Sequence, residues 1–180
     1  MKSKMKHYSP LPKIEVYDNV YTLAHRYDIQ EHVKKSVFQI GWSDTADNTE
    51  TYMFAQWTPE KLNSIKFFAP YTKDHPLHTK IDPDKFLRCI VNNDVCTNTH
   101  WTHTHINENV LLYYVNMEWH DHWGGETLFF DKNNNSDIIF GSRFTPGRVM
   151  WFDGEYPHTI KCQSRLATKY RFSISVFFNK

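Results

Sequence analysis

Residues 109–115 read Asn-Val-Leu-Leu-Tyr-Tyr-Val, a run rich in β-branched and aromatic side chains that favours a β-strand. Similar short runs lie on either side of it, and turn residues such as Gly124-Gly125 and Pro146-Gly147 separate them. These runs cover residues 85–91, 126–130, 137–140, 148–152 and 170–178. Many short strands without intervening helices predict a jelly roll or a related barrel of two sheets.

The first half of the chain adds predicted helices to this β-rich core. Between residues 28 and 40, Ile29, Val33 and Val37 recur at a spacing of four, which is typical of one face of a helix. A second helix is expected to begin at Pro59, since proline is favoured at the first helical position. We therefore expect a mainly β protein whose helical N-terminal part packs on one of the sheets.

Composition narrows the class of protein. The 180-residue chain has 21 Lys and Arg against 20 Asp and Glu, a net charge of +1 that favours neither nucleic acid nor an anionic membrane as a partner. No stretch approaches the ~20 apolar residues of a membrane span, and no apolar run of a secretion signal follows the basic start. Three cysteines without a C-x-x-C pair do not predict a disulfide framework. We expect a cytoplasmic protein with a flexible basic tail at residues 1–12, a single domain at 13–180 and a β core at about 85–178.

Histidines are concentrated in one part of the sequence, where five of the 11 fall between residues 100 and 122. His103 and His105 are two residues apart on an extended stretch, so their side chains are expected to point the same way. His158 follows His103 by 55 residues, enough chain for several strands to return it to the same end of a barrel. Three imidazoles so placed could hold one metal ion and leave positions open for substrate and O2. The alternative, histidines that are simply exposed or buried, stays open on spacing alone.

A second pair of polar residues lies on the last predicted strand. Arg171 and Ser173 are two residues apart, so the guanidinium and the hydroxyl share one face. Such a pair suits a carboxylate, which accepts two hydrogen bonds from the guanidinium and one from the hydroxyl. A surface arginine on an edge strand is the alternative.

Taken in order, these motifs resemble those of the Fe(II)/2-oxoglutarate dioxygenases. The chain looks most like the prolyl-hydroxylase-type branch, especially its small phage-encoded and marine bacterial members, over about residues 85–180. The ordered set is specific although no single motif is. The motifs are His103-Thr104-His105, Tyr113-Tyr114-Val115-Asn116, Trp123-Gly124-Gly125-Glu126-Thr127, Pro146-Gly147-Arg148, Phe152-Asp153-Gly154, Pro157-His158 and Arg171-Phe172-Ser173.

The resemblance implies a double-stranded β-helix that holds Fe(II) at one mouth. His103 and His158 match the two iron-binding histidines, and no catalytic residue beyond the metal ligands is implied. The usual first motif of the family is H-x-D or H-x-E, whereas His105 stands where its carboxylate would be. We therefore expect His103, His105 and His158 as the metal ligands.

The resemblance also implies how 2-oxoglutarate is bound. Arg171 and Ser173 match the residues that hold its distal carboxylate, and the Tyr114 hydroxyl is expected to meet the same group, while Tyr113 points into packing. Thr127 is expected to line the cosubstrate pocket. The 13 residues between His158 and Arg171 are more than usual, which a loop near residues 163–166 would explain, with Arg165 as the alternative basic residue.

The implied activity is hydroxylation of a C–H bond with Fe(II), 2-oxoglutarate and O2, on a prolyl or other peptide side chain or on a small molecule. Two other classes stay open: a three-histidine, cupin-type oxygenase without 2-oxoglutarate, and a non-catalytic metal-binding jelly-roll protein. The second H-x-H motif, His120-Asp121-His122, is expected at a solvated loop tip or in a loop that contacts substrate. His75, His78 and His100 have no partner at ligand spacing, so we expect them to be structural.

Overall fold

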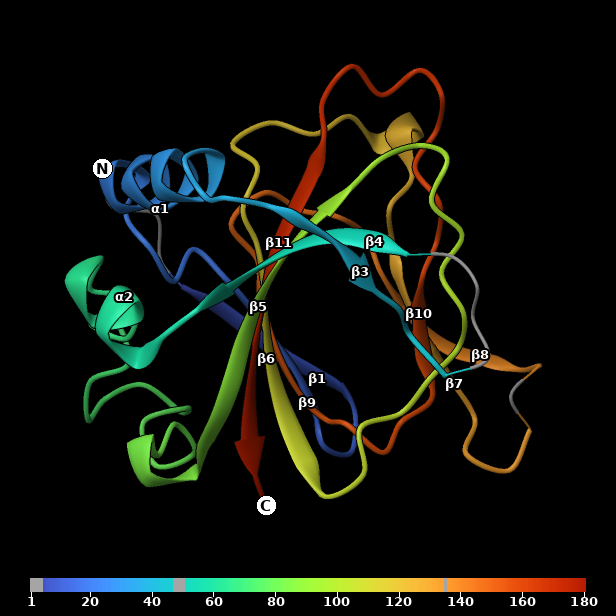
Figure 1. Ribbon diagram of the computed structural model, residues 1–180. Helices are drawn as coiled ribbons and strands as arrows, with labels where there is room; N and C mark the ends of the chain where they lie inside the picture. Colours follow the sequence, from blue (N-terminus) through green and yellow to red (C-terminus); the bar gives the residue numbers. More distant parts are fainter. Residues whose placement is uncertain (1–4, 47–50, 135) are drawn as a thin grey trace.

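The computed structural model describes residues 5–46, 51–134 and 136–180, and within these residues the chain forms two β-sheets (Figure 1). The large sheet has eight strands, in the order β1-β2-β9-β6-β11-β5-β4-β3, and the small sheet has the order β10-β7-β8. All neighbouring strands pair antiparallel. The large sheet consists of β1 (Lys6–Leu11), β2 (Ile14–Asp18), β9 (Val149–Asp153), β6 (Glu108–Tyr114), β11 (Arg171–Asn179), β5 (Phe86–Asp94), β4 (Tyr52–Trp57) and β3 (Gln39–Trp42); the small sheet consists of β10 (His158–Ile160), β7 (Thr127–Phe130) and β8 (Ile138–Ser142).

Two α-helices, α1 (Leu23–Lys34) and α2 (Pro59–Ser64), lie on the side of the large sheet away from the small one (Figure 1). Helix α2 begins at Pro59, as expected, because the Thr58 side chain accepts a hydrogen bond from the Lys61 N–H at 3.3 Å. Two short 3-10 helices, η1 (Pro83–Lys85) and η2 (Asp121–Trp123), complete the elements. No helix among the described residues is long and apolar enough to cross a membrane.

Helix α1 differs from the expected range of 28–40. It starts at Leu23 because Thr22 caps it, accepting a hydrogen bond from the His25 N–H at 3.2 Å, and it ends at Lys34. Ile29 and Val33 are buried as expected, whereas Val37 lies past the end of the helix and is 83% exposed. The spacing of four therefore identified the buried face but not the bounds.

Alternation along the central strand β11 divides the interior into two cores. Phe172, Ile174 and Val176 face the helices and belong to the larger apolar cluster. Phe177 belongs to a second cluster, with residues of β2, β6, β7 and β9. Arg171 and Ser173 share the face of Phe177, because side chains two residues apart on a strand point the same way. The interior between the two sheets thus receives both apolar and polar side chains from β11.

The mainly β fold with helices packed on one sheet is confirmed, and each of the six predicted strand runs contains a strand. The first half of the chain is less helical than expected, since it also supplies β1 to β4. Residues 6–11, which we expected in a flexible tail, form strand β1, which pairs with β2 across a turn where Lys13 has a positive φ of 63°. Strand β1 lies at the sheet edge and is mostly exposed. Its sequence therefore lacks the alternation of apolar and polar residues that predicts a strand.

Candidate metal centre

Three histidines from two distant segments meet at one end of the two sheets. One ring nitrogen of each of His103, His105 and His158 lies within 4.8 Å of the corresponding atoms of the other two. The ring centres are 4.5 Å apart for His103 and His158, 5.0 Å for His103 and His105, and 5.2 Å for His105 and His158. This convergence is the geometry that one bound metal ion requires of three imidazole ligands.

The backbone holds each histidine in place. His103 and His158 form an antiparallel β-bridge, in which each N–H donates to the carbonyl oxygen of the other at 3.0 Å. The His105 N–H donates to the Gly154 carbonyl oxygen at 2.7 Å. The ligands are therefore fixed relative to each other by main-chain hydrogen bonds.

Two of the imidazoles have a defined tautomer. Nδ1 of His103 lies 3.0 Å from the Trp101 carbonyl oxygen, and Nδ1 of His158 lies 2.7 Å from the Tyr156 carbonyl oxygen. A carbonyl oxygen only accepts hydrogen bonds, so Nδ1 carries the proton in both rings. Nε2 then keeps its lone pair, and an outer hydrogen bond of this kind is usual for histidines that bind metals.

Burial keeps the imidazoles of His105 and His158 uncharged. Burial lowers the pKa of His105 to about 3, helped by the neighbouring His103 and Arg88. Burial also lowers the pKa of His158 well below its usual value, helped by the other two histidines. Both imidazoles are therefore neutral at neutral pH, which is the form that binds a metal ion.

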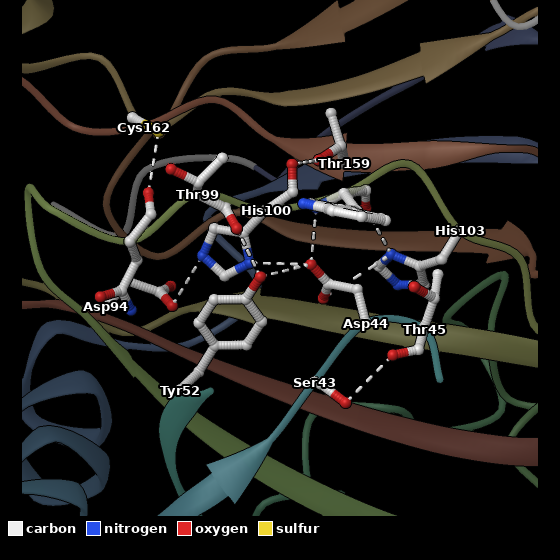
Figure 2. A network of polar contacts seen from close by, with 12 residues as sticks. Ser43, Asp44, Thr45, Tyr52, Asp94, Thr99, His100, His103, Thr159 and Cys162 are labelled. Atoms are coloured by element: carbon white, nitrogen blue, oxygen red, sulfur yellow. Dashed lines mark hydrogen bonds and ion pairs between the residues drawn. The ribbon is translucent and has the colours of Figure 1, made fainter. Parts of the chain in front are cut away.

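A buried network of charged side chains adjoins these ligands (Figure 2). His100 lies between two carboxylates, with Nε2 at 3.1 Å from Asp94 Oδ1 and Nδ1 at 3.4 Å from Asp44 Oδ2. Asp94 also pairs with the Arg171 guanidinium at 2.8 Å, and the other oxygen of Asp44 is 3.7 Å from Nδ1 of His103. The network thus runs from Arg171 through Asp94, His100 and Asp44 to the candidate ligand His103.

The charges in this network alternate in sign. Burial alone would lower the pKa of His100, but Asp94 and Asp44 outweigh it and raise the pKa to about 9. Burial would raise the pKa of Asp94 and of Asp44, but for Asp94 the charges of His100 and Arg171 outweigh it, and for Asp44 His100 and His103 do so. Both carboxyls consequently have a pKa below the usual value. At neutral pH the network is guanidinium, carboxylate, imidazolium and carboxylate.

The four residues expected to bind 2-oxoglutarate form one cluster beside this network. The Tyr114 hydroxyl donates to Thr127 Oγ1 at 2.7 Å, and Arg171 Nη1 lies 3.4 Å from Ser173 Oγ. The Arg171 guanidinium lies over the Tyr114 ring, with Cζ 5.5 Å from the ring centre, whereas Tyr113 lies in the apolar core with the helices.

The guanidinium of Arg171 already has partners. It is fully buried, pairs with Asp94 and donates from Nε to the Gly125 carbonyl oxygen at 3.1 Å. Its Nη2 is buried without a hydrogen-bond partner among the described residues. An unpaired buried donor is costly, so this atom fits the oxygen of a further anionic group.

A small cavity between the sheets connects the two clusters. Its wall includes the three histidines, together with Thr127 and Ser173, while Arg171 and Tyr114 contact these two residues without lining it. Its volume is about 60 Å³, room for a few waters. The imidazole set fits a transition metal, and the hydroxyl and guanidinium donors fit a carboxylate.

Other candidates lie elsewhere. Arg165 is exposed on the loop between β10 and β11, and His120 and His122 are exposed, with their rings stacked at 5.6 Å. His75 is not part of the group formed by His103, His105 and His158. Asp44 and Asp94 were not among the site residues predicted from the sequence. Asp94 had a signal, since an acid follows the apolar run of β5, but Asp44 had none.

Comparison with known proteins shows the fold. No protein-family model matches the sequence, and no curated protein matches it by sequence. Solved structures match over nearly the whole chain. A prolyl hydroxylase from Trichoplax adhaerens, in complex with a peptide fragment of the hypoxia inducible factor oxygen degradation domain, has a TM-score of 0.65 at 14% identity and covers 93% of this chain and 83% of that one.

Two bacterial structures agree with it. A prolyl-4-hydroxylase from Pseudomonas putida has a TM-score of 0.64 at 11% identity and covers 93% of both chains. An oxidoreductase of the 2OG-Fe(II) oxygenase family from Burkholderia pseudomallei has a TM-score of 0.64 at 11% identity and covers 90% of this chain and 82% of that one. The chain therefore has the jelly-roll fold of the 2-oxoglutarate- and Fe(II)-dependent oxygenases.

Proposed function

We propose that this protein is an Fe(II)- and 2-oxoglutarate-dependent dioxygenase that hydroxylates a C–H bond. The observation that carries the proposal is the convergence of His103, His105 and His158 beside a cavity between the sheets of an oxygenase fold. Residues 13–180 act as its single catalytic domain, and the cytoplasm is its proposed location. The narrower resemblance to phage-encoded members stays a prediction.

In this proposal the chain's residues hold and orient the reactants. His103, His105 and His158 bind Fe(II) through one ring nitrogen each. Arg171 and Ser173 bind the distal carboxylate of 2-oxoglutarate, and Tyr114 and Thr127 complete that pocket. Bound iron, with 2-oxoglutarate and O2, would supply the oxidation of the C–H bond.

For the prime substrate we propose a prolyl or other peptide side chain, with a small molecule as the alternative. The support is the likeness of the fold to prolyl hydroxylases, one of which was solved with a peptide bound. The basis is analogy of fold, so a panel of proline-containing peptides is the first set to test.

A second candidate is a three-histidine oxygenase that uses no 2-oxo acid. The ion pair between Arg171 and Asp94 favours it, because a carboxylate of the chain already occupies the guanidinium.

The test is turnover of 2-oxoglutarate without a prime substrate, measured as succinate and as O2 uptake after anaerobic loading with Fe(II). We expect iron-dependent succinate from the wild type and none above background from His103→Ala or His158→Ala. O2 uptake with a panel of substrates but no 2-oxo acid supports the second candidate instead. Tight Zn(II) binding without O2 uptake under any condition would indicate the third class, a non-catalytic metal-binding protein.

A further inference from the structure

Asp44 lies beside the ligand His103 although it comes from a distant part of the chain, shortly after β3. Its Oδ1 is 3.7 Å from Nδ1 of His103, and the side chain is only 7% exposed. Its Oδ2 accepts the backbone N–H of Trp101 at 2.8 Å. One carboxylate therefore contacts both the ring of His103 and the backbone two residues before it (Figure 2).

Other contacts also hold the same segment. The Tyr52 hydroxyl, which is 3.0 Å from Asp44 Oδ2, lies 2.5 Å from the Thr99 carbonyl oxygen. Thr159 Oγ1 donates to the His100 carbonyl oxygen at 3.0 Å without involving Asp44 (Figure 2). The ring of Tyr52 stacks on that of His100 at 4.2 Å. The backbone position of the segment thus has several supports, whereas within residues 5–46, 51–134 and 136–180 only the Asp44 carboxylate pairs with His103.

A three-histidine centre needs such a charge. Neutral imidazoles bring none to a divalent ion, and a buried ion without compensating charge is costly. Among the described residues Glu108 also lies near a ligand, with Oε2 at 3.9 Å from Nδ1 of His105. Arg88 pairs with both oxygens of Glu108, at 2.6 and 2.7 Å, whereas Asp44 pairs with His100 through Oδ2 and leaves Oδ1 facing His103.

In the network of Figure 2, Asp44 lies between His100 and the candidate ligand His103. From Arg171 through Asp94 and His100 the charges alternate, and Asp44 is the terminal anion. A divalent ion held by His103 would continue this alternation. The three-histidine set and the buried acid therefore complement each other in charge.

We propose that Asp44 is the positioning residue of the metal centre: it holds the backbone of Trp101, whose carbonyl oxygen orients the imidazole of His103, and it supplies the negative charge that three neutral ligands lack. This inference rests on the proposed three-histidine site but not on the reaction performed there. Carboxylates that hydrogen-bond or face a ligating histidine commonly tune metal affinity in this way.

The experiment compares Asp44→Asn with the wild type using Co(II) and Zn(II) alone. Asparagine keeps the size of the side chain and an oxygen for the Trp101 N–H but removes the charge. We expect Co(II) affinity, measured by chelator competition, to fall roughly 10- to 100-fold, and the visible d–d bands of bound Co(II) to shift. If the wild type binds neither Co(II) nor Zn(II), the proposed three-histidine metal site is itself wrong.

Asp153→Asn is the matched control, because it makes the same change at a buried carboxylate whose ion-pair partners are Lys13 and Lys180. It should bind Co(II) as the wild type does. A second pair, Asp44→Glu and Asp44→Gln, differs in charge alone and covers the case in which Asp44→Asn does not fold. The Asp44→Glu variant should bind Co(II) at least tenfold more tightly than the Asp44→Gln variant. The proposal is overturned if the wild type and Asp44→Asn, or Asp44→Glu and Asp44→Gln, bind Co(II) with equal affinity and give the same Co(II) spectrum.

Discussion

His103 and His158 are direct partners in an antiparallel β-bridge, with each backbone N–H hydrogen-bonded to the other's carbonyl oxygen at 3.0 Å. The bridge joins the segment before β6 to the start of β10, so two candidate ligands 55 residues apart are fixed by the main chain. The third, His105, is held by its hydrogen bond to Gly154. Metal affinity should therefore be sensitive to backbone displacement at these positions.

Gly154→Ala tests this sensitivity. A Cβ at Gly154 would lie 2.7 Å from the carbonyl oxygen of His105 and 2.8 Å from its Cβ, so the segment carrying His105 must move. We expect a loss of about 1–3 kcal/mol in the free energy of unfolding, as is usual for overpacking, together with weaker Zn(II) binding. Urea unfolding and chelator competition measure the two effects.

The control for this variant is Gly141→Ala, whose Cβ would meet only a Leu128 methyl group at 3.3 Å. It should leave Zn(II) affinity unchanged. If Gly154→Ala also binds Zn(II) like the wild type, then the Gly154 contact does not position the His105 ligand.

Arg171→Gln should abolish measurable 2-oxoglutarate binding in calorimetry with an inert metal. Losing one partner of a buried charged hydrogen bond typically costs about 2–5 kcal/mol. The variant also leaves Asp94 without its guanidinium, so the free energy of unfolding should fall by roughly 3–5 kcal/mol. Circular dichroism at the assay temperature must show that the variant is folded.

Arg165→Ala is the comparison for Arg171→Gln, because Arg165 is exposed on the β10–β11 loop. It should keep wild-type affinity for 2-oxoglutarate. The opposite pattern, with affinity lost only in Arg165→Ala, moves the carboxylate-binding role to that loop.

The ion pairs of His100 predict a pH dependence of stability. Its pKa is raised to about 9 in the folded protein, against about 6.5 in an unfolded chain. The stabilisation is therefore complete below about pH 6.5 and is lost as the pH rises to about 9; its upper limit is roughly 3 kcal/mol. The free energy of unfolding of the wild type should decline across this window, measured by urea titrations at several pH values.

His100→Gln should lack this part of the pH dependence, and the difference between the two proteins isolates the imidazole from other groups that titrate there. An NMR titration of His100 gives an independent reading, with an expected midpoint well above that of an exposed histidine. Parallel stability profiles, or a midpoint near 6.5, contradict a charged His100 between the two carboxylates.

Much of the β core could be predicted from sequence because its strands alternate or are apolar throughout. Residues 110–115 and 171–178 are buried on both faces and have the β-branched and aromatic composition of strands. Strand β1 could not be predicted, since it is an exposed edge containing Pro10, and β10 has only three residues. Edge and short strands depend on pairing partners that the local sequence does not specify.

Some residues of the candidate metal site could likewise be predicted from the sequence, and others could not. The H-x-H spacing on an extended stretch predicts that His103 and His105 point together. The 55 residues to His158 allow that histidine to return to the same place, as the resemblance also implies. Asp44 could not be found, because only the pairing of β3 with β4 and the packing of the loop after it bring the residue to His103. The ion pair of Arg171 with Asp94 was likewise invisible, as it depends on the register between β11 and β5.

The central claim is that three histidines hold one metal ion, and anaerobic titration with Fe(II) of the wild type beside His105→Ala and His105→Asp tests it most directly. We predict one ion per chain for the wild type, strongly weakened binding in His105→Ala, and retained binding in His105→Asp, because a carboxylate can replace the imidazole as a ligand. Equal Fe(II) affinity of the wild type and His105→Ala would contradict the claim and leave a centre of two histidines, His103 and His158.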